Sequence, residues 1–182
     1  MDELSIRPAL LRDIPGLLAV INGYASQGIM LPRTELEMAE NIRDFVIAWA
    51  GNRILGCGAL HIYTPQSAEV RSLAVLPETK GAGIGRLIVE ALERDARIHS
   101  LGSIFAFTYS PGFFRKLGFD ELDRGELPLK AWKDCLRCPK FQACDEIAMR
   151  KWLVEPELRM ADAPMFAQAA RPQTLVQVGA LK

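Results

Sequence analysis

The sequence predicts an α/β (α+β) fold in one main domain, and three observations predict it. Short apolar segments typical of strands alternate with segments in which apolar residues recur every three or four positions, as on one face of a helix. The chain has 182 residues, of which 49% are hydrophobic, so it is able to bury one substantial core. A glycine-rich turn joins an apolar strand to an amphipathic helix within residues 72–86.

The predicted element order is β-α-α-β-β-β-α-β-α-β-β, read from hydrophobic spacing and from cap and turn residues. The elements that the sequence places are, in chain order, a strand at Leu4 to Pro8, helices at Arg12 to Ala25 and Glu35 to Asp44, strands at Phe45 to Ala50, Arg53 to Tyr63 and Glu69 to Leu76, a helix carrying Ile84 to Ala96, a strand at Ser103 to Phe107, a short helix near Gly112 to Leu117 and a final strand around Glu146 to Val154.

Local signals support several of these boundaries. Asp13 is a candidate cap for the first helix. Thr34 is a candidate cap for the second helix, and Glu37, three positions later, completes a capping box. Gly56 and Gly58 lie inside the second arm of the hairpin, where glycine indicates a bulge or close packing.

The glycine-rich turn has the composition of an anion-binding site. Gly81, Gly83 and Gly85 remove side chains where the backbone enters a helix, so unpaired N–H groups and the positive end of the helix dipole can meet a pyrophosphate. Lys80 and Arg86 add positive charge beside it. The G-x-G-x-G spacing, with the lysine before the glycines, fits neither a P-loop nor a dinucleotide-binding fingerprint. A purely structural tight turn is the alternative interpretation.

Charge composition argues against a polyanionic partner. The chain has 22 basic and 22 acidic residues and a pI near 6.7, so it has no global field for nucleic acid or an anionic membrane. The N-terminus lacks the charged and apolar regions of a signal peptide, and no stretch reaches the roughly 18 apolar residues of a membrane span. We expect a cytoplasmic protein that binds a small molecule rather than nucleic acid or membrane.

The segment Lys80-Gly-Ala-Gly83-Ile-Gly85 resembles the acetyl-CoA signature of the GNAT superfamily of N-acyltransferases. That signature is Arg or Gln, two residues, Gly, one residue, then Gly or Ala, directly after a strand; Lys80 retains the cation of its first position. The resemblance implies a mixed, strongly twisted sheet of about six to seven strands flanked by helices. It also implies acetyl-CoA as co-substrate, with the pantetheine arm in a wedge between the strand ending at Leu76 and the strand ending at Phe107.

In that family the first of these strands supplies backbone hydrogen bonds to the pantetheine arm, and the turn holds the pyrophosphate. The cofactor-binding residues implied here are Leu73, Ala74, Val75, Lys80, Gly81, Ala82, Gly83, Ile84, Gly85 and Arg86.

Acetyl transfer to an amine requires an uncharged nitrogen lone pair, a polarised thioester carbonyl and a proton for the leaving thiolate. Strand alternation places Glu69, Arg71, Leu73 and Val75 on one face. Glu69 is therefore a carboxylate near the wedge and the candidate base. The alternative interpretation is a surface ion pair with Arg71 or another cation.

The leaving-group acid is less defined. Members of the family commonly carry a Tyr in the short helix before a Gly-Phe pair, where this chain has Phe114. Tyr109 and Thr108, at the end of the preceding strand, are the nearby hydroxyls and the candidate acids. Packing or capping at a strand end is the alternative interpretation for each.

Four segments together resemble the acetyltransferase domain of bacterial N-acetylglutamate synthases, especially its short single-domain form: Leu31-Pro-Arg33, Cys57 to His61, Ala68 to Val75 and Phe105 to Phe119. The resemblance covers about residues 4–154, so we expect a GNAT acetyltransferase domain at 1–154 and a C-terminal tail at 155–182. It implies acetylation of L-glutamate, the first step of arginine biosynthesis, and a substrate-carboxylate ligand at Arg33.

A dicarboxylic amino acid needs one cation for each carboxylate, preferably arginine for its forked donors. Arg33 and Arg71 are the candidate substrate ligands, and Arg115 and Lys116 are alternatives. Glutamine, aspartate or another small amine remains an alternative acceptor, and the Tyr missing from the short helix keeps a non-catalytic CoA-binding regulator open. A homodimer and regulation by arginine also stay open.

The segment from Cys135 through Cys138 to Cys144 has a C-x₂-C pair followed by a third cysteine, a spacing that suits zinc. A closed zinc site needs a fourth ligand, for which Cys57, Asp145 or a second subunit are candidates. Reduced, partly buried thiols in an irregular loop are the alternative. His61, at a strand end, is interpreted as a packed and hydrogen-bonded side chain rather than a catalytic one.

Overall fold

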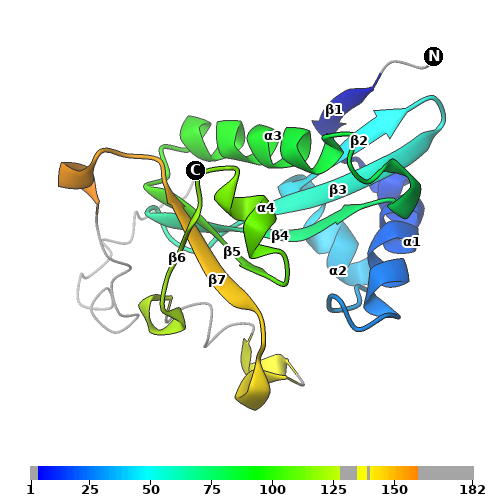
Figure 1. The fold of residues 1–182 in the computed structure, drawn as a ribbon. Helices are drawn as coiled ribbons and strands as arrows, with labels where there is room; N and C mark the ends of the chain where they lie inside the picture. Colours follow the sequence, from blue (N-terminus) through cyan, green and yellow to red (C-terminus); the bar gives the residue numbers. More distant parts are fainter. Residues whose placement is uncertain (1–3, 128–134, 139, 160–182) are drawn as a thin grey trace, which may run out of the picture.

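The computed structural model describes residues 4–127, 135–138 and 140–159 (Figure 1). This part of the chain forms a seven-stranded sheet in the order β1-β2-β3-β4-β5-β7-β6. Only β4 and β5 run parallel among the described neighbouring strands. The mixed sheet and the order of elements are as predicted from the sequence. The strands are β1 Ser5–Pro8, β2 Phe45–Ala50, β3 Arg53–Ile62, β4 Ser67–Val75, β5 Ser103–Thr108, β6 Asp120–Glu121 and β7 Ile147–Trp152, and the α-helices are α1 Ile14–Ala25, α2 Glu35–Glu40, α3 Ile84–Ile98 and α4 Pro111–Arg115.

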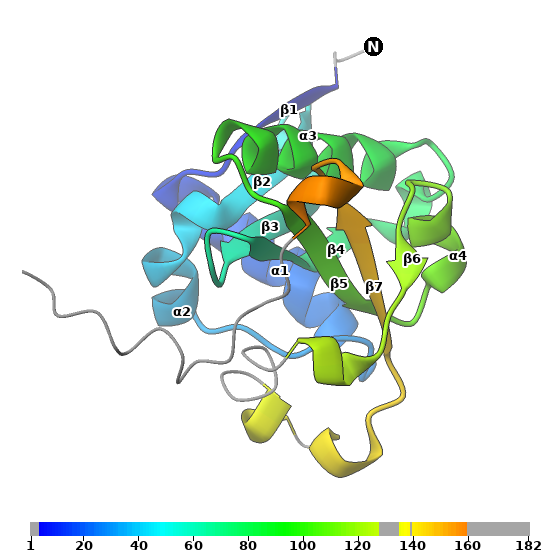
Figure 2. The same cartoon turned by 90° about the vertical axis from the view of Figure 1, so that its left-hand side faces the viewer.

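Helices cover both faces of the sheet. Helix α3 lies across one face, whereas α1 and α2 lie on the other, as Figures 1 and 2 show from two directions. The side chains divide in the same way: α3 and α4 contribute to one buried cluster, and α1 and α2 to a second. None of the described helices is long and apolar enough to cross a membrane.

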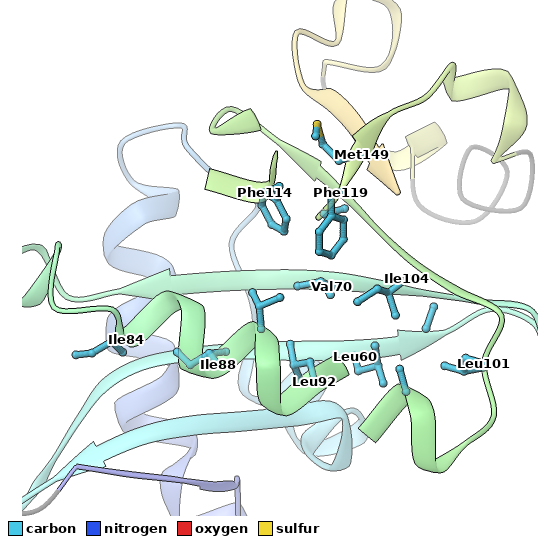
Figure 3. Close-up of a cluster of buried hydrophobic side chains, with 14 of the residues drawn as sticks. Leu60, Val70, Ile84, Ile88, Leu92, Leu101, Ile104, Phe114, Phe119 and Met149 are labelled. Atoms are coloured by element: carbon cyan, nitrogen blue, oxygen red, sulfur yellow. The ribbon is translucent and has the colours of Figure 1, made fainter. Parts of the chain in front are cut away.

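The core beneath α3 is made of aliphatic side chains from the helix and the strands, with an aromatic pair at one end (Figure 3). Each fully buried Leu or Ile contributes about 1.5–3 kcal/mol relative to an exposed position. Helix α3 is therefore held mainly by its apolar face, which the sequence predicted from its spacing. The labelled members of this core are Leu60, Val70, Ile84, Ile88, Leu92, Leu101, Ile104, Phe114, Phe119 and Met149.

The start of α1 differs from the prediction. Asp13 makes no side-chain capping bond to α1, because a 3₁₀ turn at Leu11–Asp13 precedes the helix. Its carboxylate instead accepts hydrogen bonds from the Leu10 N–H at 2.8 Å and from the Arg7 guanidinium at 2.8 and 2.9 Å. The bonds from Arg7, with that from Leu10, lower the pKa of Asp13.

The second helix begins as predicted and ends early. The Thr34 hydroxyl accepts from the Glu37 N–H at 3.2 Å, and the Glu37 carboxylate accepts from the Thr34 N–H at 2.8 Å, which confirms the capping box. Helix α2 ends at Glu40, and a separate 3₁₀ turn, Ile42–Asp44, leads into β2. This break brings Asp44 to the edge of the sheet, where it contacts β3.

A β-bulge interrupts the pairing of β3 with β4. Cys57 pairs with Ala74 and Ala59 pairs with Arg71, so β4 contains one extra residue opposite Gly58. Ser72 lies at the bulge with a φ of 52°, which is uncommon for a residue other than glycine.

The bulge corrects the predicted faces of β4. Glu69 and Arg71 were expected to share a face with Leu73 and Val75, yet both Leu73 and Val75 pack against the cluster under α3. Ala74 instead joins the cluster under α1 and α2. An extra residue shifts the alternation of side chains by one position, so the prediction is wrong beyond Ser72.

Two further features lie at the C-terminal side of the chain. Strand β6, which the sequence did not place, pairs with β7 through Asp120 and Glu121. Strand β7 confirms the predicted final strand. Most of the expected C-terminal tail, residues 160–182, lies outside the described residues, so the boundary expected after residue 154 remains a prediction.

We expect Gly56→Ala to destabilise the protein by about 1–3 kcal/mol. A Cβ at this position would lie 2.8 Å from the Ala74 backbone oxygen and 3.1 Å from Ile88 Cδ1, and the strand that carries the oxygen is fixed by its pairing. Chemical denaturation monitored by circular dichroism measures the change.

Gly23→Ala is the matched control, because a Cβ there meets nothing within 4 Å and the residue lies in the interior of α1. It should stabilise the protein by roughly 0.5–1 kcal/mol. A Gly56→Ala variant as stable as the Gly23→Ala variant contradicts the expected close packing.

Candidate active site

The site begins where β4 and β5 separate. These parallel strands pair through only three positions, the last of which joins Glu69 to Phe105. Beyond it β4 continues to Val75 beside β3, and β5 continues to Thr108 beside β7. The two strands therefore enclose a wedge, as predicted, and each leaves backbone groups facing the other strand without ladder hydrogen bonds between them.

Glu69 lies at the apex of this wedge, on the face covered by α1 and α2. Its side chain is buried, with 3% of the residue exposed. The Tyr63 hydroxyl donates a hydrogen bond to Glu69 Oε2 at 3.1 Å. His61 is the direct partner of Glu69 across the pairing of β3 with β4, so the two side chains share a face. A buried carboxylate beside a wedge between strands is a candidate proton acceptor.

Arg71 lies two residues beyond Glu69 on the same face. Its Nη2 is 3.8 Å from Asp44 Oδ2 and 3.4 Å from Asn41 Oδ1, both in the segment between α2 and β2. Asp44 Oδ2 also lies 2.8 Å from His61 Nδ1. The guanidinium is thus fixed beside the wedge rather than extended into solvent.

Arg33 reaches the same region from the connection between α1 and α2. Its main chain is held by Asn22, which donates to the Arg33 carbonyl at 3.0 Å and accepts from the Arg33 N–H at 2.9 Å. Its Nη2 lies 3.5 Å from the Ser72 hydroxyl, next to Arg71 in sequence. The structure therefore brings Glu69, Arg71 and Arg33 to one side of the sheet.

The glycine-rich turn follows β4 and ends at the first residue of α3. Gly81 and Gly83 have φ values of 87° and 79°, which L side chains rarely adopt, and Gly83 is the N-cap of α3. Residues 81–83 are exposed, and the first turn of α3 carries no acidic residue. The N–H groups that begin α3 therefore face an open, electropositive end of the helix.

The two flanking cations of the turn differ in their surroundings. Lys80 lies over the ring of Tyr24, with its Nζ 5.0 Å from the ring centroid. Arg86 donates from Nε to Glu90 at 2.6 Å, so its charge is shared with that carboxylate. Lys80 is accordingly the better placed of the two to meet an anion at the turn.

Tyr24 was not predicted as a site residue. Its hydroxyl donates to the Val75 carbonyl at 2.5 Å, which ties the end of β4 to α1. Together with the contact to Lys80, this bond links the first helix to the strand end and the turn. Asn22, two residues before Tyr24, likewise ties α1 to the site through its hydrogen bonds to the Arg33 main chain. No local sequence motif indicates the role of either residue.

The candidate acids at the end of β5 have separate environments. The Thr108 hydroxyl is buried and accepts from the Ser110 N–H at 2.9 Å, which is the capping role given above as its alternative. Tyr109 is 41% exposed; its hydroxyl donates to Asp145 Oδ1 at 2.8 Å and accepts from Lys140 Nζ at 2.9 Å.

The pKa of Tyr109 is raised. The hydrogen bond from Lys140 lowers it, but burial and the carboxylates of Asp145 and Glu146 outweigh that effect. The phenol consequently stays protonated near neutral pH, as a proton donor must. Phe114, which occupies the position of the usual Tyr, packs into the core against Phe119, with ring centroids 5.1 Å apart.

The zinc prediction finds no support. Among the residues that the structure describes, no group of three or more His, Cys, Asp or Glu side chains is placed to hold a metal ion. Cys135, Cys138 and Cys144 therefore do not form the predicted set with Cys57 or Asp145, and Cys57 is buried beneath the bulge of β4 with its Sγ 3.6 Å from the Ser72 carbonyl.

Comparisons with known proteins agree with this geometry. Residues 41–121, from the turn before β2 to β6, match the model of the acetyltransferase (GNAT) domain. A protein of Chlorobaculum tepidum named an uncharacterized N-acetyltransferase is 43% identical over 151 residues, which are 83% of this chain and 97% of that protein. The chain belongs to the GNAT family of acetyltransferases.

Two further relatives concern amino acids by name. An amino-acid acetyltransferase of Mycobacterium tuberculosis is 32% identical over 121 residues, 65% of this chain and 69% of that protein. The crystal structure of N-acetylglutamate synthase from Neisseria gonorrhoeae, with coenzyme A and N-acetyl-glutamate, aligns with 85% of this chain at 26% identity and a TM-score of 0.76. The aligned region spans 36% of that synthase, so the chain corresponds to one part of the larger protein.

The surroundings of Tyr109 predict how its ionisation responds to substitution. Asp145→Asn should lower the pKa of Tyr109, because it removes a negative charge and leaves a weaker, neutral hydrogen-bond acceptor, whereas Lys140→Met should raise it further, because it removes the one partner that lowers it. Absorbance of phenolate against pH, with a Tyr109→Phe variant subtracted, measures both shifts. Shifts of the same sign in the two variants contradict this arrangement.

Proposed function

We propose that the protein transfers the acetyl group of acetyl-CoA to the α-amine of L-glutamate, the N-acetylglutamate synthase reaction. The observation that carries the proposal is the arrangement along β4. A buried carboxylate lies at the apex of the wedge, two arginines lie on the same face of the sheet, and an anion-binding turn follows the other end of the strand.

The cofactor would extend along β4. Its pyrophosphate would meet the N–H groups at the start of α3, between Gly81 and Arg86, with Lys80 beside it. Its pantetheine arm contains amides that could pair with β4 backbone groups beyond Glu69, where the ladder between β4 and β5 ends. Leu73 and Val75 turn their side chains toward α3, so these positions would contribute main-chain rather than side-chain contacts. The thioester would then lie near the wedge apex.

The acceptor would occupy the face under α1 and α2. Arg33 and Arg71 would each bind a carboxylate, since forked guanidinium donors suit that group. Glu69 would take a proton from the α-amine, directly or through a water, and the nitrogen would attack the thioester carbonyl carbon. The carbon–sulfur bond then breaks, and the thiolate takes the proton of Tyr109, which is exposed and protonated, in preference to Thr108, whose hydroxyl serves as a cap. The nitrogen gives up its second proton, which restores the Tyr109 hydroxyl, and Glu69 returns the first proton to solvent.

The relatives support an amino-acid acceptor without fixing which one. One is named an amino-acid acetyltransferase, and the N-acetylglutamate synthase that aligns at a TM-score of 0.76 was solved with coenzyme A and N-acetyl-glutamate. Glutamine is the second candidate, and one observation favours it: Asp44 lies 3.8 Å from Arg71 and offsets part of its charge. Arginine biosynthesis is the pathway that glutamate acetylation would serve.

The direct test is thiol release from acetyl-CoA in the presence of single amino acids. We expect release with glutamate, and to a lower degree with glutamine or aspartate, because the two arginines select carboxylates. Amines that lack a carboxylate should give only background. If no amino acid causes thiol release while calorimetry still detects acetyl-CoA binding, the proposed acceptor is wrong and the proposed cofactor site stands.

Glu69→Gln should lower kcat by about 10²–10⁴, the range typical of a general base, while coenzyme A binding is retained. The substitution keeps the size of the side chain and its acceptor oxygen for Tyr63 but removes the proton acceptor. Steady-state thiol release and calorimetry measure the two quantities. Glu155→Gln, an exposed carboxylate beyond β7, is the control and should keep the original rate. Unchanged turnover in Glu69→Gln excludes Glu69 as the essential base.

A further inference from the structure

A second acid–base pair adjoins the proposed acceptor site. His61 Nδ1 lies 2.8 Å from Asp44 Oδ2, and the same oxygen lies 3.8 Å from Arg71 Nη2. The Asp44 side chain is 27% exposed and the His61 side chain 15% exposed. The carboxylate of Asp44 is therefore shared between Arg71, which is always positively charged, and His61, which is positively charged only when it is protonated.

The surroundings of His61 place it inside the acceptor region. It is the cross-strand partner of Glu69, and its ring packs edge to face against Tyr63 with centroids 5.0 Å apart. Among the described residues, the titratable or charged groups near it include Asp44, Arg71, Glu69 and Tyr63. Arg43 lies next to Asp44 in the same 3₁₀ turn. Asp44 contacts the ring nitrogen and also faces Arg71, an arginine of the proposed substrate site.

The charge presented to the acceptor depends on the state of His61. The guanidiniums of Arg33 and Arg71 with the carboxylate of Asp44 give a net charge of +1 when His61 is neutral. Protonation of His61 raises this to +2. Glu69 is left out of the count because it faces the amine of the acceptor. Histidine is the side chain whose charge ordinarily changes between about pH 5 and 8.

We propose that Asp44 and His61 adjust acceptor specificity: protonation of His61 increases the preference for a dicarboxylic amino acid over one with a neutral side chain, and loss of that proton decreases this preference. Asp44 and His61 are positioning residues that act through Arg71. This inference rests on the proposed function, since it concerns the acceptor of that reaction.

Glutamate and glutamine form the appropriate pair of acceptors. They share the α-amine and α-carboxylate and differ in the charge of the side chain, and the glutamate side chain stays ionised over about pH 6 to 9. The ratio of kcat/KM for glutamate to kcat/KM for glutamine therefore isolates the effect of site charge. Proton transfer to Glu69 and the fraction of folded enzyme influence both acceptors alike and cancel in the ratio.

The experiment measures this ratio from pH 8.5 to pH 6 in the full chain and its variants. In the original protein the ratio should rise about threefold to tenfold as the pH falls, the scale expected for one nearby charge. His61→Gln should hold the ratio flat at the value of the original protein at high pH. Asp44→Asn should raise the ratio by a similar factor already at pH 8.5, because it removes the charge that opposes Arg71.

The second histidine of the chain supplies matched controls. His99 and Asp95 form an exposed pair on α3, 3.9 Å apart, away from the wedge. His99→Gln and Asp95→Asn should keep the pH profile of the original protein. A response in these variants equal to that of His61→Gln assigns the effect to general surface charge and overturns the inference.

The remaining outcomes distinguish a failure of this inference from a failure of the proposed function. A pH-independent ratio in the original protein, a slope retained in His61→Gln or a lower ratio in Asp44→Asn each overturns the role of the pair while glutamate acetylation stands. If the original protein releases thiol with neither acceptor, the proposed function fails, and the inference fails with it. The inference is supported if the ratio is lower in His61→Gln than in the original protein at low pH and higher in Asp44→Asn at high pH.

Discussion

Strand β4 is hydrogen-bonded to β3 from Ala68 to Val75 but to β5 through three positions only, and the arrangement of the site depends on this difference. Strand β5 is held in turn by β7 along its whole length, from Ser103 to Thr108. Each strand is thus fixed along its outer edge, so the inner edges diverge without loss of the sheet. The divergence starts at Glu69, which leaves a buried carboxylate at the point where the wedge closes.

The bulge in β4 adds a second constraint to the first. By inserting one residue near Ser72 it turns Leu73 and Val75 toward α3 and keeps Glu69 and Arg71 on the opposite face. A regular strand would have placed polar and apolar side chains on the same face. Burial raises the pKa of the Cys57 thiol to about 12, so a neutral thiol lies beneath the bulge, 3.6 Å from the Ser72 carbonyl. Gly56 permits the close approach of the Ala74 backbone, and Gly58 leaves room for the side chains of Ile88 and Leu92 on α3.

The features that the sequence predicted correctly are those set by neighbouring residues. The capping box at Thr34, the apolar face of α3 and the glycine turn that leads into this helix follow from a few consecutive positions. The features that it missed depend on contacts between distant segments. The shift at Ser72 requires the register of β3, and the role of Asp13 requires Arg7 on β1. The pairing of Glu69 with His61 also depends on this register, because the predicted strand bounds would have placed Tyr63 opposite Glu69.

The two faces of the sheet consequently differ in role: one is apolar, and the other carries the charged side chains of the candidate site. The face under α3 is aliphatic and aromatic, and its burial supplies free energy that opposes the entropy of the chain. The face under α1 and α2 carries Glu69, Arg71, His61 and Asp44 near its open end, where each charge is costly to bury and ion pairs stabilise little in return. Concentrating these groups on one face confines the loss of stability to the region where the chemistry needs them. The same sheet can then hold a polar, titratable site without weakening the cluster that keeps its strands together.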